Sequence, residues 1–183
     1  IWIAVAEQTG ISQLRRITRD EPDYDLLMKG RLALLDEHSL TLSLITEVIG
    51  GLPALDGARE FLDELRTRVQ VVILSDTFEQ FAAAFRGRLD LPTVLCHRLV
   101  VADDRVVDYA LRQPDAKRRA VESFRQLNYR VVAAGDSYND SSMLTAADVG
   151  FWFNAPAGIA AEFPRFTALD SFDALLASIT AAL

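Results

Sequence analysis

The sequence predicts an α/β protein in which helices cover both faces of a parallel sheet, with a small helical lobe ahead of it. Residues 1 to about 56 have only helical periodicity, whereas short β-branched runs alternate with helical segments from residue 69 onward. This alternation is typical of a parallel sheet with crossover helices. The length of 183 residues, half of them apolar, is sufficient for one ordinary domain with a small additional lobe.

The predicted lobe, residues 1–56, contains three helices, and a fourth helix opens the predicted core, residues 57–183. Gly10 closes the first helix, and Gly50, Gly51 and Pro53 end the third, because glycine and proline interrupt helical geometry. Leucines in the second helix form a broad apolar face. The four expected helices span residues 1–8, 23–38, 41–49 and 57–68.

The core begins at residue 69 with an apolar β-branched run, Val69 to Leu74, which has the composition of a strand buried on both faces. Further strands are expected at 93–97, 130–134 and 149–153, and a hairpin pairs 99–101 with 106–111 around Asp103 and Asp104. The expected helices span 78–89, 115–127, about 136–147, 157–163 and 172–182.

The formal net charge of −7 argues against a nucleic acid or an anionic membrane as the main partner. A single cysteine, Cys96, cannot form an internal disulfide and suits a reducing cytoplasm. No apolar run is long enough to span a membrane. The chain opens directly on Ile1-Trp2-Ile3 without an initiator Met, and we expect the sequence to begin inside a longer protein.

Polar residues follow two of the predicted strands, at the edge where ligands bind in open parallel sheets. After the first comes Ser75-Asp76-Thr77, which either caps the next helix or binds an anion with its hydroxyl and backbone N–H groups. After the second comes Gly135-Asp136-Ser137-Tyr138-Asn139-Asp140. Carboxylates four residues apart can share Mg²⁺, which takes one or two protein carboxylates and completes its shell with water and phosphate.

Lys117 lies between these two segments, at the start of a predicted helix. Of the 19 basic residues, only Lys29 and Lys117 are lysines. A lysine in such a chain is either part of a solvated basic face or a compact point charge for a phosphate or a carboxylate.

Together these segments resemble the haloacid dehalogenase superfamily of phosphatases, which has a Rossmann-like core. Leu-Ser-Asp-Thr matches its second motif, Lys117 its third and Gly-Asp-Ser-Tyr-Asn-Asp its fourth. Within the superfamily, the chain is similar to phosphoserine phosphatases of the bifunctional phosphoserine phosphatase/homoserine phosphotransferase branch. The resemblance extends over essentially the whole chain.

The resemblance implies a Mg²⁺-dependent hydrolysis of L-phosphoserine through an aspartyl-phosphate. Asp136 is then the metal ligand, with Asp140 in its outer shell, and Lys117 and Ser75 are the catalytic residues that hold nucleophile and phosphate. Arg31 binds the substrate carboxylate, and Asp76 and Asn139 are further substrate-binding residues. Under this hypothesis the helices before residue 56 form a cap lobe. Met28 is interpreted as pocket lining or core, and His38 and His97 as structural.

Two features depart from the family pattern. Asp76-Thr77 replaces the Gly-Gly that ordinarily follows the second-motif serine, which leaves open whether water or homoserine accepts the phosphoryl group. The first motif is absent, because the first Asp is Asp20. The nucleophile, the general acid and the central strand are therefore expected ahead of Ile1.

Other functions stay open. The main alternative is a module that binds phosphate or an amino acid without turnover, and the helical lobe and the late Asp136/Asp140 pair disfavour a receiver-like signalling domain. The expected partner is a small phosphorylated amino acid in the cytoplasm, and a homodimer is left open.

Overall fold

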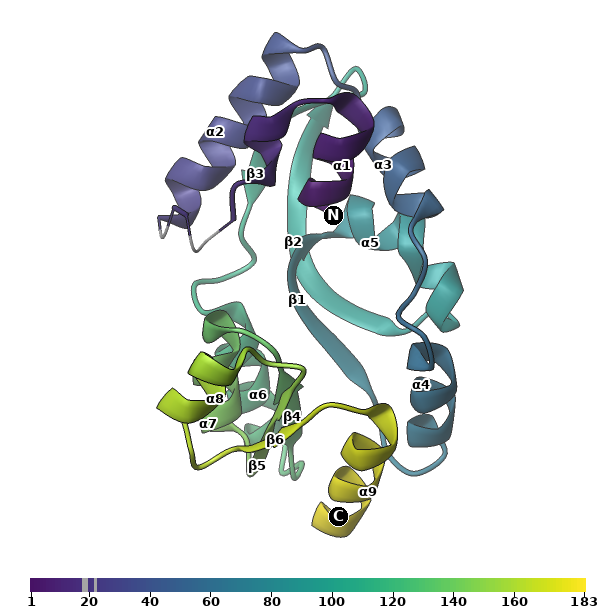
Figure 1. Ribbon diagram of the computed structural model, residues 1–183, viewed down its shortest axis with the longest axis vertical. Coiled ribbons are helices and arrows are strands. Elements are labelled where there is room, and N and C mark those ends of the chain that lie inside the picture. Colours follow the sequence, from purple (N-terminus) through teal and green to yellow (C-terminus); the bar gives the residue numbers. More distant parts are fainter. Residues whose placement is uncertain (18–19, 22) are drawn as a thin grey trace. The chain divides into compact units, whose positions relative to one another are not determined.

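The computed structural model describes residues 1–17, 20–21 and 23–183 (Figure 1). They divide into two compact units. The first unit comprises Ile1–Ala54 and Asp76–Arg112, and the second comprises Leu55–Ser75 and Gln113–Leu183. The predicted boundary at residue 56 lies beside the first division, but residues 76–112 cluster with the N-terminal helices. That the N-terminal helices act as a cap lobe stays a prediction.

The helices of the first unit follow their capping signals. Gly10 ends the first helix with a φ of 75°, and the Asp23 carboxylate accepts hydrogen bonds from the backbone N–H groups of Asp25 and Leu26 at the start of the second. The α-helices are α1 (Trp2–Thr9), α2 (Tyr24–Glu37), α3 (Leu42–Gly51) and α5 (Glu79–Phe85), and 3₁₀ turns span Ser12–Arg15 and Arg86–Leu89.

The strands β1 (Val72–Phe78), β2 (Thr93–Ala102) and β3 (Arg105–Ala110) form one sheet in the order β1-β2-β3. The β2–β3 hairpin is antiparallel and turns through Asp103 and Asp104, whose positive φ values of 48° and 61° suit a two-residue turn. The two short strands predicted at 93–97 and 99–101 are one continuous strand, because pairing with β3 carries the extended backbone through Arg98. β1 likewise continues through Ser75-Asp76-Thr77 rather than ending there.

One apolar cluster forms the core of the first unit. It joins helices and sheet, since α1, α2, α3, α5 and both strands of the hairpin contribute to it. Its buried residues include Val5, Leu14, Met28, Leu35, Ile45, Ile49, Phe78, Phe81, Leu99 and Val106.

The second unit has the predicted parallel sheet with helices on both faces. Its strands β4 (Val132–Gly135), β5 (Val149–Phe153) and β6 (Thr167–Leu169) are parallel and lie in that order. The short strand β6 is not predicted by the sequence pattern. The helices of this unit are α4 (Ala58–Arg66), α6 (Ala116–Gln126), α7 (Ser141–Ala146), α8 (Ala157–Glu162) and α9 (Phe172–Ala182).

Successive side chains of β5 contact different helices, which shows which helices cover each face of the sheet. Phe151 and Phe153 pack with Leu65 of α4 and Leu175 of α9, whereas Trp152 packs in a separate cluster. That second cluster contains residues of α6, α7 and α8, namely Val121, Met143, Leu144 and Ile159. Because successive side chains of a strand point to opposite faces, α4 and α9 cover one face and α6, α7 and α8 the other.

The strands of the described residues form two three-stranded sheets. β1 is hydrogen-bonded to β2, and β4 to β5, so the Ser75 strand and the Asp136 strand belong to different three-stranded sheets. Sequence patterns identify strands but not their partners, because hydrogen-bonded pairing joins residues far apart in the chain. Among the described residues, no helix has the length and apolar character needed to cross a membrane.

Candidate functional site

The loop after β4 is organised by Asp140, which is buried. Its Oδ2 atom accepts hydrogen bonds from the backbone N–H groups of Asp136, at 3.0 Å, and Ser137, at 3.2 Å. The Ser137 hydroxyl donates to this oxygen at 3.3 Å and also accepts from the backbone N–H of Asp140, which completes a reciprocal cap at the 3₁₀ turn Tyr138–Asp140. Asp140 therefore fixes the backbone that presents Asp136 at the end of β4.

Gly135 is required by this arrangement. A Cβ atom on Gly135 would lie 2.5 Å from the Cβ of Asp140, closer than non-bonded carbon atoms approach. The sequence contains the glycine, but nothing in it indicates that the carboxylate five residues later folds back against it.

Lys117 and Asp140 form a buried ion pair. The Lys117 Nζ lies 2.7 Å from Asp140 Oδ1, and the two side chains are only 11% and 6% exposed. Lys117 lies in the first turn of α6, and Asp115, which precedes that helix, accepts a 2.9 Å hydrogen bond from Ser142 of α7. The packing of α6 on α7 thus brings Lys117 to the Asp140 loop.

Asp136 differs from Asp140 in its electrostatic environment. Burial, followed by the negative charge of Asp140, raises the pKa of Asp136, while the Lys117 ammonium opposes them. The anionic form of Asp136 is thus destabilised by its surroundings. A bound cation would stabilise this form. Asp140 already uses both oxygens on Lys117 and on backbone N–H groups.

The donor set fits Mg²⁺ through Asp136. No group of three or more His, Cys, Asp or Glu side chains among the described residues is arranged to enclose a metal ion. Mg²⁺ does not need such a cage, since it usually binds one or two carboxylates and keeps water and phosphate oxygens as its other ligands.

Ser75 and Asn139 are placed by their neighbours. Leu74 packs against the apolar cluster that contains Ala133 of β4, and Ser75 follows it in β1. Asn139 lies in the Asp136–Asp140 loop, where its side-chain oxygen accepts a hydrogen bond from the Ser137 hydroxyl. The second unit therefore brings together Lys117, Asp136, Asn139 and Asp140 and also contains Ser75.

Arg31 lies in α2 of the first unit, and its side chain is buried rather than facing solvent. It is 7% exposed, its guanidinium carbon lies 4.6 Å from the centre of the Trp2 ring, and one Nη donates a 2.7 Å hydrogen bond to the carbonyl of Arg16. Among the described residues, its Nε has no hydrogen-bond partner. Burial lowers the pKa of Arg31 to about 10. A guanidinium so placed can still accept an anionic ligand.

Asp76 lies in the middle of β1, at the point where the strand passes into the first unit. Two of its neighbours were not indicated by the sequence. The Tyr24 hydroxyl donates to the Asp76 carbonyl at 3.3 Å, and the buried His97 places Nε2 3.7 Å from Asp76 Oδ1. His38, by contrast, is exposed at the end of α2. Tyr24, His97, Trp2 and Gly135 are the residues of interest that sequence analysis missed or interpreted as merely structural.

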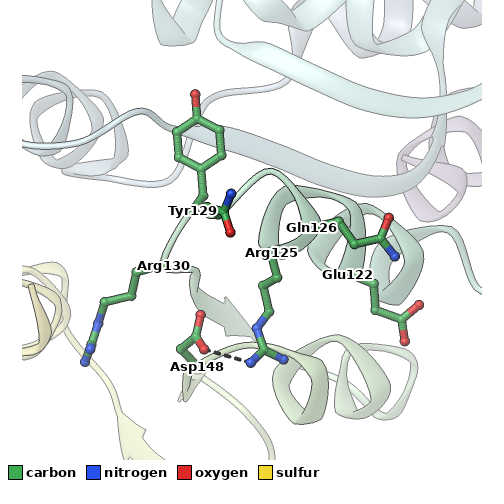
Figure 2. Close-up of a pocket in the computed structure, with 7 residues that line it drawn as sticks. Glu122, Arg125, Gln126, Tyr129, Arg130 and Asp148 are labelled. Carbon is green, nitrogen blue, oxygen red and sulfur yellow. Dashed lines mark ion pairs between the residues drawn. The ribbon is translucent and has the colours of Figure 1, made fainter.

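A groove of about 630 Å³ lies at the end of the β4-β5-β6 sheet that is opposite to Asp136 (Figure 2). Tyr129 and Arg130 precede β4 and Asp148 precedes β5, so the groove is at the amino ends of these strands, whereas Asp136 follows the carboxyl end of β4. Its charges are partly satisfied internally, since Arg125 pairs with Asp148 at 3.0 Å. The groove is lined by Glu122, Arg125, Gln126, Asn128, Tyr129, Arg130 and Asp148.

Comparison with known proteins agrees with this fold. Residues 3–148 match the model of the haloacid dehalogenase-like hydrolases, and the chain belongs to this family. The predicted α/β fold class and the family resemblance are thereby confirmed.

Two curated relatives are more specific. The chain is 57% identical to a phosphoserine phosphatase of Pseudomonas syringae pv. tomato over 96% of this chain and 74% of that protein. It is 56% identical to phosphoserine phosphatase ThrH of Pseudomonas aeruginosa over 96% of this chain and 86% of that protein. A crystal structure of phosphoserine phosphatase from T. onnurineus shares the fold, with a TM-score of 0.74, 20% identity and coverage of 97% of this chain and 86% of that one.

Proposed function

We propose that the protein hydrolyses L-phosphoserine to L-serine and phosphate in a Mg²⁺-dependent reaction. The observation that carries this proposal is the buried Lys117–Asp140 pair beside Asp136 at the carboxyl end of β4, in a chain 56–57% identical to proteins named phosphoserine phosphatase. The lone buried Cys96 supports a reducing compartment, and we place the reaction in the cytoplasm.

The side chains present act mainly by binding and charge neutralisation, the principal tasks in phosphoryl transfer. The Ser75 hydroxyl binds a phosphate oxygen. The Lys117 ammonium, held by Asp140, neutralises charge between phosphate and nucleophile, and Asn139 donates a hydrogen bond from the same loop. In the proposed reaction the phosphoryl group passes through an aspartyl-phosphate on the carboxylate of the family's first motif.

Asp136 would hold Mg²⁺, with Asp140 orienting the loop around it. When bound, the ion neutralises phosphate charge and lets two anions approach each other. Asp140 belongs to the outer shell in this proposal because its oxygens are already occupied by Lys117 and by backbone N–H groups.

The test is phosphate release by the protein expressed from its complete reading frame. With L-phosphoserine we expect release that requires Mg²⁺ and stops with EDTA. Asp136→Asn should lower turnover at least ~100-fold, because metal-based charge stabilisation contributes several kcal/mol. The exposed Asp170→Asn serves as the matched control. If no phosphate is released, while calorimetry detects bound phosphoserine, the protein is a binding module and the proposal is wrong.

Arg31 provides a separate test of the amino-acid substrate. We propose that its guanidinium binds the substrate carboxylate, since it is buried and its Nε has no hydrogen-bond partner among the described residues. Arg31→Ala should raise KM for phosphoserine about 10- to 100-fold, the equivalent of a charged hydrogen bond. The KM for O-phosphoethanolamine, which lacks the carboxylate, should change less than about threefold. Equal changes would contradict the assignment, and Arg15→Ala on the surface is the control.

Transfer of the phosphoryl group to homoserine is a second candidate activity. It is favoured by Asp76-Thr77, which stands where ordinary phosphoserine phosphatases have Gly-Gly. Adding homoserine to the phosphoserine reaction should yield phosphohomoserine, detected by mass spectrometry. Its absence at saturating homoserine would leave water as the acceptor.

A further inference from the structure

A buried histidine lies beside the carboxylate of Asp76. His97 is 4% exposed and its Nε2 lies 3.7 Å from Asp76 Oδ1, while the Asp76 side chain is 34% exposed. The two residues come from β1 and β2, which are neighbours in the same sheet. The histidine is thus fixed in the core, and the carboxylate that it contacts retains access to a ligand.

The orientation of His97 is set by Arg112, which contacts the ring through its backbone. The Arg112 N–H donates to His97 Nδ1 at 3.3 Å, and the other ring nitrogen, Nε2, faces Asp76. Arg112 is itself tied down, because its Nε donates to the carbonyl of Cys96 at 2.6 Å and its guanidinium pairs with Glu79. These contacts fix the ring so that Nε2 stays beside the Asp76 carboxylate.

The charges of Asp76 and Arg31 both affect the pKa of Tyr24, which lies close to the Asp76 carboxylate. The pKa of Tyr24 is raised to about 12 by burial and by the charge of Asp76, and Arg31 opposes this rise. Tyr24 also donates its hydroxyl to the Asp76 carbonyl. Asp76 and Arg31 are therefore opposite charges within electrostatic range of one phenol in the first unit.

We propose that Asp76 binds the α-ammonium group of the phosphorylated amino acid and that His97 is the positioning residue that orients its carboxylate. This inference rests on the proposed phosphoserine substrate and deepens it. An amino acid presents an ammonium and a carboxylate on one carbon, and Asp76 and Arg31 have the complementary charges. An ammonium group has three N–H donors and no acceptor, which suits a partly exposed carboxylate.

Substrate analogues separate this role from the others. The specificity ratio is kcat/KM for phosphoserine divided by kcat/KM for 3-phosphooxypropanoate, which keeps the carboxylate and lacks the ammonium. Asp76→Asn should lower this ratio about tenfold or more, as expected for loss of a charged hydrogen bond. Asp103→Asn, in the β2–β3 turn, is the matched control and should leave the ratio as it is. An unchanged ratio in Asp76→Asn would overturn the proposal.

The role of His97 is tested with two variants of different chemistry. His97→Gln keeps an N–H donor at the position of Nε2, whereas His97→Phe keeps the ring and removes the donor. We expect His97→Phe to lower the specificity ratio about three- to tenfold and to raise KM more than it lowers kcat, and His97→Gln to retain most of the ratio. The exposed His38→Phe is the control.

A structural role would give a different pattern. If both His97 variants lose thermal stability and keep the specificity ratio, His97 does not position Asp76. Failure of the proposed phosphoserine substrate would look different. The wild-type protein would then still hydrolyse p-nitrophenyl phosphate with Mg²⁺, but it would show no preference for phosphoserine over O-phosphoethanolamine or 3-phosphooxypropanoate.

Discussion

Gly135 has no room for a side chain, because Asp140 folds back against it. We expect Gly135→Ala to destabilise the protein by ~1–3 kcal/mol, the usual effect of forcing an extra methyl group into a packed site. The clash involves the Cβ of Asp140 rather than the end of a flexible chain, so relief requires movement of the loop. The measurement is the free energy of unfolding in urea.

Gly158 provides the control for this prediction. It lies in α8, and a Cβ placed there meets no atom within 4 Å. Gly158→Ala should be neutral or stabilise by up to ~1 kcal/mol, because alanine favours helix. Equal destabilisation by both substitutions would show that the Asp140 contact is not the cause.

Asp136 should oppose folding at neutral pH. Its pKa is raised above the ordinary value of 3.8, so the folded protein binds this proton more tightly than the unfolded chain. The stabilising contribution of the protonated form is complete below pH 3.8 and is lost as pH rises through the folded-state pKa. Asp136→Asn should therefore raise Tm at pH 7 in EDTA, whereas the proposed function predicts that it lowers Mg²⁺-dependent turnover.

Thermal unfolding as a function of pH checks this sign. The Tm difference between Asp136→Asn and wild type should shrink toward pH 3, where the wild-type carboxyl group is also neutral. Adding Mg²⁺ should raise the Tm of the wild type only, because a ligand of the folded state stabilises it. A variant less stable than wild type at pH 7 without metal would contradict this account of Asp136.

At the scale of elements, the two lysines of the chain show how context decides the value of an ion pair. Both contact an aspartate, but Lys29 pairs with Asp25 on the exposed face of α2, whereas Lys117 pairs with the buried Asp140. A buried carboxylate left without its partner is costly. Lys117→Met should therefore destabilise by ~3–5 kcal/mol, while Lys29→Met should have little effect.

A double variant tests whether the unpaired Asp140 carboxylate causes this loss of stability. Lys117→Met combined with Asp140→Asn removes the buried charge of Asp140 that the single variant leaves without its partner, so part of the lost stability should return, as measured by urea unfolding. A double variant that loses the sum of both single effects would show that the two residues act independently.

Local signals predicted most of these elements. The ends of α1, α2 and α3 follow Gly10, Asp23 and Thr41, and β5 and α9 have the predicted bounds, because caps and apolar periodicity act between residues close in sequence. The three-residue strand β6 was missed because it is too short to show a period and is formed by pairing with β5.

At the scale of the whole molecule, each unit has an apolar core of its own. We expect a cavity in one core to weaken that unit first, because local opening follows local contacts. Ile45→Ala, in the core of the first unit, should cost ~2–5 kcal/mol and raise amide hydrogen exchange within Ile1–Ala54 and Asp76–Arg112.

The exposed Leu44→Ala on the same helix is the control and should change exchange little. Mass spectrometry of exchanged peptides resolves the two units. If protection falls equally in Leu55–Ser75 and Gln113–Leu183, the whole chain opens cooperatively and the two cores are not independent.

The sequence by itself determined most of the order of helices and strands, the family, and the placement of Lys117 at the start of α6 and of Asp136 after β4. These features depend on local composition and on short motifs. Only the tertiary structure decided that Lys117 pairs with Asp140, that Arg31 is buried against Trp2, that His97 contacts Asp76, and that β1 and β4 belong to different sheets. Each of these depends on contacts between residues far apart in the chain, which packing and strand pairing create and which local patterns do not specify.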